Sequence, residues 1–205
     1  MEELFEADAW AAHPGGASSR GHFLPDGTFI FGVSHRIERQ APQSLDTHIG
    51  KTLRINDDGS APADNPFYAV EGALAEIFTW GNRSVMDFAV HPETGEIWEL
   101  ENGPQGGDEV NINLKPFKKI KNFGWPVSSY GEHYYKAYSK KILQEAPLNK
   151  SHKKYGFAEP IKYFVPSIGI SQIIPLNKDE TKFLIGAMGN EIKDQDLGLH
   201  LILLD

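Results

Sequence analysis

The sequence of 205 residues contains no cysteine, and this absence excludes several kinds of site at once. A disulfide scaffold, a thiolate nucleophile and a Cys-ligated zinc or iron–sulfur centre all need residues that the chain lacks. Long hydrophobic runs are missing too, since no apolar stretch approaches the ~20 residues of a membrane-spanning helix. We therefore expect no membrane span. The start Met1-Glu2-Glu3 is the reverse of the basic start of a signal peptide.

An overall excess of basic charge is also absent, because 28 acidic side chains face 20 basic ones and give a net charge of −8. The charge is uneven: residues 1–110 carry 19 acidic and 6 basic side chains, whereas residues 111–205 carry 9 and 14. A nucleic-acid-binding domain is usually basic as a whole, so we interpret the lysine-rich half as a solvated face and expect no nucleic-acid partner. The acidic half favours neutral substrates or cations.

Helical periodicity is scarce, and most of the chain consists of short apolar runs between turn signals. Residues 88–90 and 97–100 flank the turn His91-Pro92-Glu93-Thr94-Gly95, which predicts a hairpin. Further strands are expected in runs of the same kind at 29–33, 51–55, 110–112, 161–164, 173–174, 183–185 and 199–204. The pattern predicts an all-β fold in a single domain over residues 1–205.

One segment departs from the strand pattern. Residues 136–156 are polar and rich in lysine, and we interpret them as an exposed insertion with one helical stretch around 135–144. Elsewhere the turn signals recur every 30–40 residues, which is the scale of β-propeller blades. A sandwich or a barrel fits this spacing nearly as well, so the pattern alone leaves the three architectures open.

Three segments carry a resemblance to a known family. The first is residues 101–109, Glu-Asn-Gly-Pro-Gln-Gly-Gly-Asp-Glu, followed by Asn-Phe-Gly-Trp-Pro at 122–126. The second is residues 50–60, from Gly-Lys-Thr-Leu-Arg-Ile to Asp-Asp-Gly-Ser, and the third is Val-Pro-Ser-Ile at 165–168. In order and spacing they resemble the glucose/sorbosone dehydrogenase family, soluble aldose dehydrogenases that use pyrroloquinoline quinone (PQQ).

The resemblance implies a six-bladed β-propeller, with PQQ over the central channel and calcium holding the cofactor. At ~40–50 residues a blade, the chain has length for about four blades, so it resembles a partial propeller. The implied activity is oxidation of an aldose sugar to its lactone, with electrons passing to a separate acceptor. The family's members are typically exported, which implies a periplasmic or secreted protein, although the chain shows no signal peptide.

The same resemblance assigns metal ligands. Glu109 and the main-chain oxygen of Phe123 correspond to one calcium site, and the carbonyls of Gly103 and Pro104 correspond to the calcium that binds PQQ. Calcium prefers hard oxygen ligands such as these. Taken without the family, the stretch is better interpreted as a solvated acidic turn that closes a hairpin, and the resemblance is what favours calcium.

Two residues are matched to the cofactor and the chemistry. Arg83 aligns with the family's arginine near the quinone oxygens, and it suits the carboxylates of PQQ. His13 is the candidate base that removes the proton from the anomeric hydroxyl, because a histidine titrates near neutral pH. The family's histidine itself aligns with Gly16, so His13 serves only if this loop is three residues longer.

Other positions depart from the family pattern. Ser84 and Met86 stand where asparagine and glutamine are usual, Ser34 replaces an aspartate, and the segment around Gly189 lacks the expected lysine. Two alternatives to the dehydrogenase therefore stay open. One is a non-catalytic calcium-binding propeller that binds sugars or a protein partner, and the other is a calcium-dependent hydrolase of the lactonase type.

Overall fold

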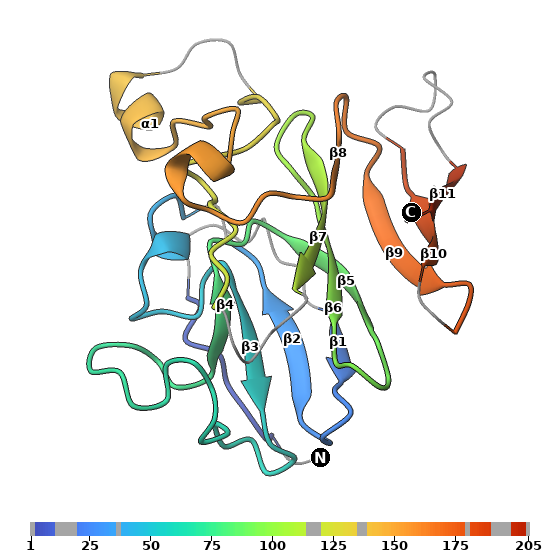
Figure 1. Cartoon of the computed structure of the whole chain (residues 1–205). Helices are drawn as coiled ribbons and strands as arrows, with labels where there is room; N and C mark the ends of the chain where they lie inside the picture. The colour runs from blue at the N-terminus through green and yellow to red at the C-terminus, as the bar shows by residue number, and fades with distance from the viewer. Residues whose placement is uncertain are drawn as a thin grey trace.

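The chain folds into three successive antiparallel sheets, seen in the computed structural model of Figure 1. The structure describes residues 3–10, 20–35, 38–113, 120–134, 139–178, 181–189 and 198–203. Within each sheet every strand pairs with its neighbour in sequence. The all-β prediction is confirmed.

The first sheet has the order β1-β2-β3-β4, with β1 Gly21–Phe23, β2 Phe29–Val33, β3 Lys51–Ile55 and β4 Ile77–Trp80. The second is β5-β6-β7-β8, with β5 Val85–Val90, β6 Ile97–Glu101, β7 Asp108–Asn113 and β8 Lys162–Phe164. The third is β9-β10-β11, with β9 Ile170–Pro175, β10 Lys182–Ala187 and β11 Gly198–Leu203. Short helices lie outside the sheets: η1 Ala41–Gln43, α1 Lys140–Glu145 and η2 Lys153–Tyr155.

Each run that the sequence predicted as a strand forms one. The predicted hairpin is the β5–β6 pair, in which Val90 faces Ile97 across the turn. Strands β1 and β4 were not predicted. The three-residue sequence Gly-His-Phe in β1 and the sequence Ile-Phe-Thr-Trp in β4 show no clear alternation. Tertiary pairing with β2 and β3 makes them strands.

Two apolar cores lie between successive sheets. The first joins sheet one to sheet two through a cluster of buried side chains: Leu24, Ile30, Phe78, Val85, Phe88, Val90 and Ile97. The second joins sheet two to sheet three through another: Ala89, Trp98, Leu100, Val110, Ile170, Ile173, Phe183 and Ile185. Strands β1, β5 and β9 also contact one another in succession. Sheets that pack face to face around a row of first strands are arranged like propeller blades.

The chain direction brings several loops to one end of the sheets. Strands β4, β6 and β8 finish at the end where β3, β5, β7 and β9 begin. The connections 34–50, 81–84, 102–107 and 165–169 therefore meet there, and α1 lies above them in Figure 1. This end carries Arg83, Gly103, Pro104 and Glu109, four of the residues that the sequence predicted as functional.

The described residues form three blade-like sheets rather than about four. The difference arises from the connection between β7 and β8, which takes up the length of a further sheet. Its predicted helix is present as α1, and its lysines 153 and 154 are exposed. The same connection is not solvated throughout, however, because Ala146, Leu148 and His152 are buried. Among the described residues no helix has the length and apolarity to span a membrane.

Candidate functional site

Arg83 lies in the four-residue link between β4 and β5. Its Nη1 donates to the main-chain oxygen of Asn102 at 2.6 Å, and its Nη2 donates to the hydroxyl of Tyr134 at 3.3 Å. The guanidinium carbon lies 5.3 Å from the ring centroid of Trp125, a cation–π distance. Its Nε is buried without a hydrogen-bond partner among the described residues. Burial lowers the pKa of Arg83, yet a guanidinium stays charged in proteins. The Nε–H of Arg83 therefore has no hydrogen-bond partner among the described residues, although the guanidinium is held in place.

The loop 102–107 beside Arg83 is fixed by Asp108. One carboxylate oxygen of Asp108 accepts from the N–H of Gly103 at 2.9 Å and the hydroxyl of Ser167 at 2.9 Å. The other accepts from three successive N–H groups, those of residues 168, 169 and 170, at 3.1, 2.7 and 3.2 Å. A side chain at Gly103 would lie 2.0 Å from the oxygen of Gly107, so the loop has room only for glycine there. Through these hydrogen bonds Asp108 links the loop 102–107 to the segment 167–170.

Three buried carboxylates lie on the other face of the same sheet. Glu101 pairs with Glu109 across β6 and β7, and Glu99 lies two residues before Glu101 on the same face. Burial raises the pKa of Glu101 to about 8, and the nearby charge of Glu109 adds to the shift. Burial also raises the pKa of Glu99 well above its usual range. Glu99 accepts from the side-chain amide of Asn82 at 2.6 Å. This face holds more acidic groups than it can keep ionised.

His152 faces Glu109 from the connection between β7 and β8. Its Nε2 lies 3.2 Å from Oε1 of Glu109, and only 1 % of the His152 side chain is exposed. Burial lowers the pKa of His152, but the carboxylates of Glu109 and Glu159 outweigh burial and raise it overall. The ring of Tyr130 stacks on the imidazole at 5.5 Å between centroids. His152 is therefore buried against the carboxylate of Glu109, with its ring held by Tyr130.

The segment 122–125 closes the site from the side of the first sheet. The N–H of Phe123 donates to Trp80 at 2.9 Å, and the N–H of Trp125 donates to Gly81 at 2.8 Å. The side-chain amides of Asn122 and Gln43 bond to each other, at 2.8 and 3.1 Å. These contacts hold the Phe123 carbonyl and the Trp125 ring in fixed places.

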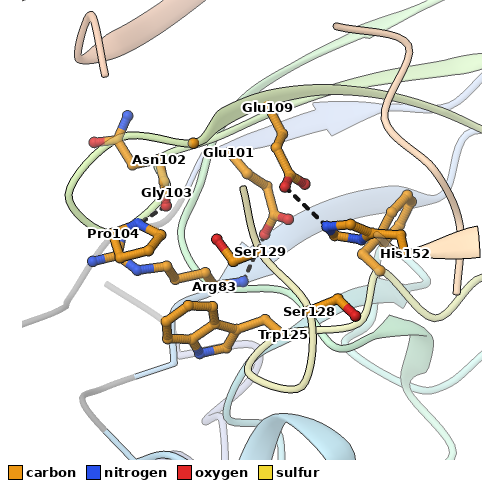
Figure 2. A pocket seen from close by; sticks show the side chains of 12 residues that line it. Arg83, Glu101, Asn102, Gly103, Pro104, Glu109, Trp125, Ser128, Ser129 and His152 are labelled. Carbon is orange, nitrogen blue, oxygen red and sulfur yellow. Dashed lines mark hydrogen bonds and ion pairs between the residues drawn. The ribbon is translucent and has the colours of Figure 1, made fainter. Parts of the chain in front are cut away.

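Figure 2 shows how these groups surround one small cavity. Its walls come from the link 81–84, the loop after β6, the start of β7 and the connection to β8, and the lining residues are Arg83, Glu101, Asn102, Gly103, Pro104, Gly107, Glu109, Phe123, Trp125, Ser128, Ser129 and His152. In the view, Arg83 extends below Pro104, while the carboxylate of Glu109 points to His152. The cavity is thus cationic and amide-rich at one end and acidic at the other.

The structure brings together five of the six residues that the sequence proposed for the site. Arg83, Gly103, Pro104, Glu109 and Phe123 all line this cavity although they come from four segments. The sixth, His13, lies outside the described residues. Its proposed role as the base stays a prediction.

The departures from the family pattern have local explanations. Ser84 and Ser34 are both buried, and their hydroxyl oxygens lie 3.2 Å apart. Met86 packs on the core between sheets two and three instead of lining the cavity. Gly189 has a φ of 77°, a conformation that favours glycine over lysine.

Sequence reasoning missed two contributors to the cavity. His152 was set aside because its spacing matches no metal-ligand motif, and Trp125 was noted only as part of a motif. The pairing with Glu109 joins residues 43 positions apart, so no local pattern reveals it. The one available signal was the family motif around Trp125. Across the described ranges no group of three or more His, Cys, Asp or Glu side chains could hold a metal ion.

Comparisons with known proteins identify the family of the chain. The sequence model of a family described as Glucose / Sorbosone dehydrogenase matches residues 1–194. The aldose sugar dehydrogenase YliI of Escherichia coli is 33% identical over 176 residues, which cover 83% of this chain and 43% of that protein. The quinoprotein glucose dehydrogenase B of Acinetobacter calcoaceticus is 38% identical over 108 residues, 52% of this chain and 20% of that protein. The chain spans less than half the length of these relatives.

Solved structures show the same fold. The soluble aldose sugar dehydrogenase of Escherichia coli, crystallised in its apo-form, superposes with a TM-score of 0.74 at 30% identity. The match covers 91% of this chain and 50% of that one. A further structure described as a glucose dehydrogenase superposes with a TM-score of 0.76 at 26% identity, over 98% of this chain and 57% of the other. The β-propeller fold expected from the resemblance is confirmed.

Proposed function

The chain belongs to the glucose/sorbosone dehydrogenase family, and from this premise we propose that it takes part in the PQQ-dependent oxidation of an aldose sugar to its lactone. A sugar dehydrogenase function of the PQQ type is what its relatives support in general. The lactone as product, calcium as second cofactor and a separate electron acceptor are finer parts of the same proposal.

The buried Nε of Arg83 is the observation that carries this proposal. The other two nitrogens of the guanidinium, Nη1 and Nη2, already form hydrogen bonds and hold the group in place. Among the described residues, Nε is the guanidinium donor without a partner. PQQ carries three carboxylates and two quinone oxygens, and each is an acceptor that such a donor suits. The ring of Trp125 beside the guanidinium adds a flat apolar surface of the kind that a planar ligand contacts.

The loop held by Asp108 provides the second element. The carbonyls of Gly103 and Pro104 are hard oxygen donors in a loop that Asp108 keeps rigid, which suits calcium beside the cofactor. The Ser167 hydroxyl, which donates to Asp108, lies 3.2 Å from the Pro104 oxygen. We propose these two oxygens as calcium ligands.

In the proposed reaction the bound quinone supplies the acceptor for a hydride and the chain supplies position and proton transfer. Arg83 orients the cofactor through its free donor. His13 is proposed to take the proton of the anomeric hydroxyl at an imidazole nitrogen. Trp125 and Pro104 narrow the cavity and limit the entry of water.

A titration of the calcium-loaded protein with PQQ tests the proposal. Arg83→Ala should weaken PQQ binding at least tenfold, about 1.4 kcal/mol, because the fixed donor is lost. Arg39→Ala is the matched control, since Arg39 is 39% exposed and pairs with Glu145 at 3.8 Å away from the cavity. Equal affinities for the wild type and Arg83→Ala would remove Arg83 from the cofactor site.

The base is tested separately. His13→Ala should abolish turnover of an aldose while PQQ binding is retained, because the variant loses the proton acceptor and none of the proposed cofactor contacts. Dye reduction linked to PQQ measures the turnover. Turnover at the wild-type rate would exclude His13 as the base.

One alternative has an observation in its favour. Ser84 and Met86 stand where the family pattern has two amide side chains, and Met86 packs in the core. A propeller that binds a sugar or a protein partner without oxidising it would need neither amide. Sugar binding without PQQ binding, measured by calorimetry, would favour this alternative over the dehydrogenase.

A further inference from the structure

Lys51 is the first residue of β3, and its side chain is completely buried, with 0% of the residue exposed. Its Nζ donates to three main-chain oxygens, those of Ala41, Pro42 and Ile49, at 2.9, 3.3 and 2.7 Å. A lysine ammonium has three N–H donors and no acceptor, so each donor has a carbonyl to bond. A buried charge is costly unless it is hydrogen-bonded, and these bonds hold the segment 41–49, the η1 turn, against the start of β3.

The η1 turn contacts the link between β4 and β5. The oxygen of Pro42, one of the three acceptors, also accepts from the N–H of Gly81 at 3.0 Å, and the oxygen of Gly50 accepts from the N–H of Asn82 at 3.0 Å. A side chain at Gly50 would lie 2.5 Å from Cβ of Pro42 and 2.8 Å from the oxygen of Asn82, so the turn and the link approach closely. Arg83 is the next residue of this link, and its backbone position therefore depends on the turn.

The same turn contacts the segment 122–125 through the side chain of Gln43. Its Nε2 donates to the main-chain oxygen of Trp125 at 2.7 Å and to Oδ1 of Asn122 at 3.1 Å. The N–H of Trp125 in turn donates to the oxygen of Gly81 at 2.8 Å. A side chain at Gly81 would lie 2.2 Å from Oδ1 of Asn122 and 2.7 Å from Nε2 of Gln43, so the turn, the link and the segment meet at this glycine.

The guanidinium of Arg83 and the ring of Trp125 form the cation–π pair of the cavity, and the η1 turn supports the backbone on both sides of that pair. Lys51 is not among the residues that line the cavity, so any effect on it passes through other groups. We propose that Lys51 is a positioning residue of the cofactor site, which fixes the η1 turn and thereby sets the place of the Arg83 guanidinium against the Trp125 ring. The consequence for PQQ rests on the proposed function, in which Arg83 binds the cofactor.

Arg54 provides a matched control for a merely structural role. It lies three residues further along β3 and is also a buried cation, with 3% of its side chain exposed. Its guanidinium donates to Asp26 and Asp64, both at 2.7 Å, and it does not line the cavity. Loss of either buried cation should destabilise the protein, whereas loss of Lys51 alone should change the cofactor site.

The first test is a PQQ titration of the calcium-loaded full chain. Burial lowers the pKa of Lys51 to about 7, so the measurement is made at pH 6, where the ammonium keeps its three N–H donors. Lys51→Met should weaken PQQ binding about fivefold or more, because the donor groups of the site are no longer held in place. Arg54→Met should bind PQQ within about twofold of the wild type, since a distant and independent site does not couple to the cavity.

The double variant Lys51→Met/Arg83→Ala tests whether Lys51 acts through Arg83. It should bind PQQ within about twofold of Arg83→Ala alone, because the group that Lys51 positions is already gone. Losses of affinity that multiply in the double variant, or an equal loss in Lys51→Met and Arg54→Met, would overturn the positioning role.

The second test needs no PQQ and uses the indole N–H signal of Trp125 in nuclear magnetic resonance, assigned with Trp125→Phe. The signal should shift in Lys51→Met and stay in place in Arg54→Met, and an unshifted signal in Lys51→Met would refute the proposal. If Arg83→Ala binds PQQ as the wild type does, the proposed role of Arg83 fails, while a shifted Trp125 signal still supports Lys51. Should Lys51→Met not fold, Gln43→Met decides, because it removes the amide between the turn and Trp125: a shifted signal supports the proposal and an unchanged one overturns it.

Discussion

The two faces of the second sheet are both buried, yet they differ in how their charges are treated. The face toward sheet three carries Trp98, Leu100 and Val110. Of its two acids, Asp108 accepts five hydrogen bonds and Asp87 accepts from the N–H of Ile173 at 3.1 Å. The face toward sheet one carries Glu99, Glu101 and Glu109, with His152 in contact with Glu109. On the face toward sheet three, the acidic groups are paired with hydrogen-bond donors of the protein. On the face toward sheet one, several carboxylates lie buried close to one another beside the cavity. Buried groups with shifted pKa values gather where proteins bind ligands, which favours the face toward sheet one as the ligand-binding face.

Trp98→Ala should give the largest effect, because it tests the apolar face. The ring of Trp98 packs on Phe183 at 4.2 Å between centroids and is 2% exposed. We expect a loss of about 4 kcal/mol in the free energy of unfolding, measured with urea. Trp10→Ala, at a residue 82% exposed, should cost less than about 0.5 kcal/mol. A similar loss in both variants would contradict the packing of the sheets described above.

Asp108→Ala should come next, at about 3 kcal/mol, because five donors lose their charged acceptor. The same variant should weaken any PQQ-linked calcium binding, since the loop of Gly103 and Pro104 loses its anchor. Urea denaturation and a calcium titration measure the two effects. Asp57→Ala, in an exposed turn, is the control. A normal stability for Asp108→Ala would show that the two loops do not depend on this carboxylate.

Glu99→Gln should act in the opposite direction and stabilise the protein at pH 8 by about 1 kcal/mol. The folded-state pKa of Glu99 is raised above the ordinary 4.5, so the folded protein holds a proton that the unfolded chain releases. Its contribution to stability therefore falls as the pH rises above 4.5, and the glutamine variant loses this slope while it keeps an acceptor for Asn82. Urea curves at pH 5 and pH 8 measure the slope. An unchanged slope would mean that Glu99 is not the titrating group, and Glu93→Gln on the exposed turn is the control.

Tyr163→Ala should have the smallest effect, about 1 kcal/mol, through the loss of one stacked pair at the outer end of the acidic face. Tyr163 is 44% exposed, so little apolar burial is lost. Tyr155→Ala, at a residue 43% exposed, should cost less. If both variants lose the same free energy of unfolding, the stacking of Tyr163 on Tyr130 does not stabilise the position of His152.

Most of the strands could be predicted from the sequence, because alternation and turn residues are local signals. The hairpin of β5 and β6 and the short strand β3 follow from five or six residues each. Strand β4 and the burial of Ala146 and Leu148 could not be predicted, since they depend on which distant segment packs against them. The number of sheets was overestimated because length alone does not separate a blade from a long connection.

The residues of the site divide in the same way, into those that a local motif predicts and those that only the folded structure brings together. Arg83, Gly103 and Glu109 stand in short motifs, and the family resemblance identified them before any contact was visible. His152 stands in no motif, and its importance arises from folding the β7–β8 connection back onto the sheet. Its charge state depends on Glu109 and Glu159, which lie 43 and 7 positions away along the chain.

The contact between Ser34 and Ser84 has an evolutionary consequence. The two hydroxyl oxygens lie 3.2 Å apart in a buried place, and each serine stands where the family pattern has a larger polar residue. A change at one of the two positions alone would leave the other residue without its neighbour, so we expect the two substitutions to have arisen together. Among relatives of this chain, positions 34 and 84 should covary as a pair, and an ancestor restored at one position alone should be less fit than either matched pair.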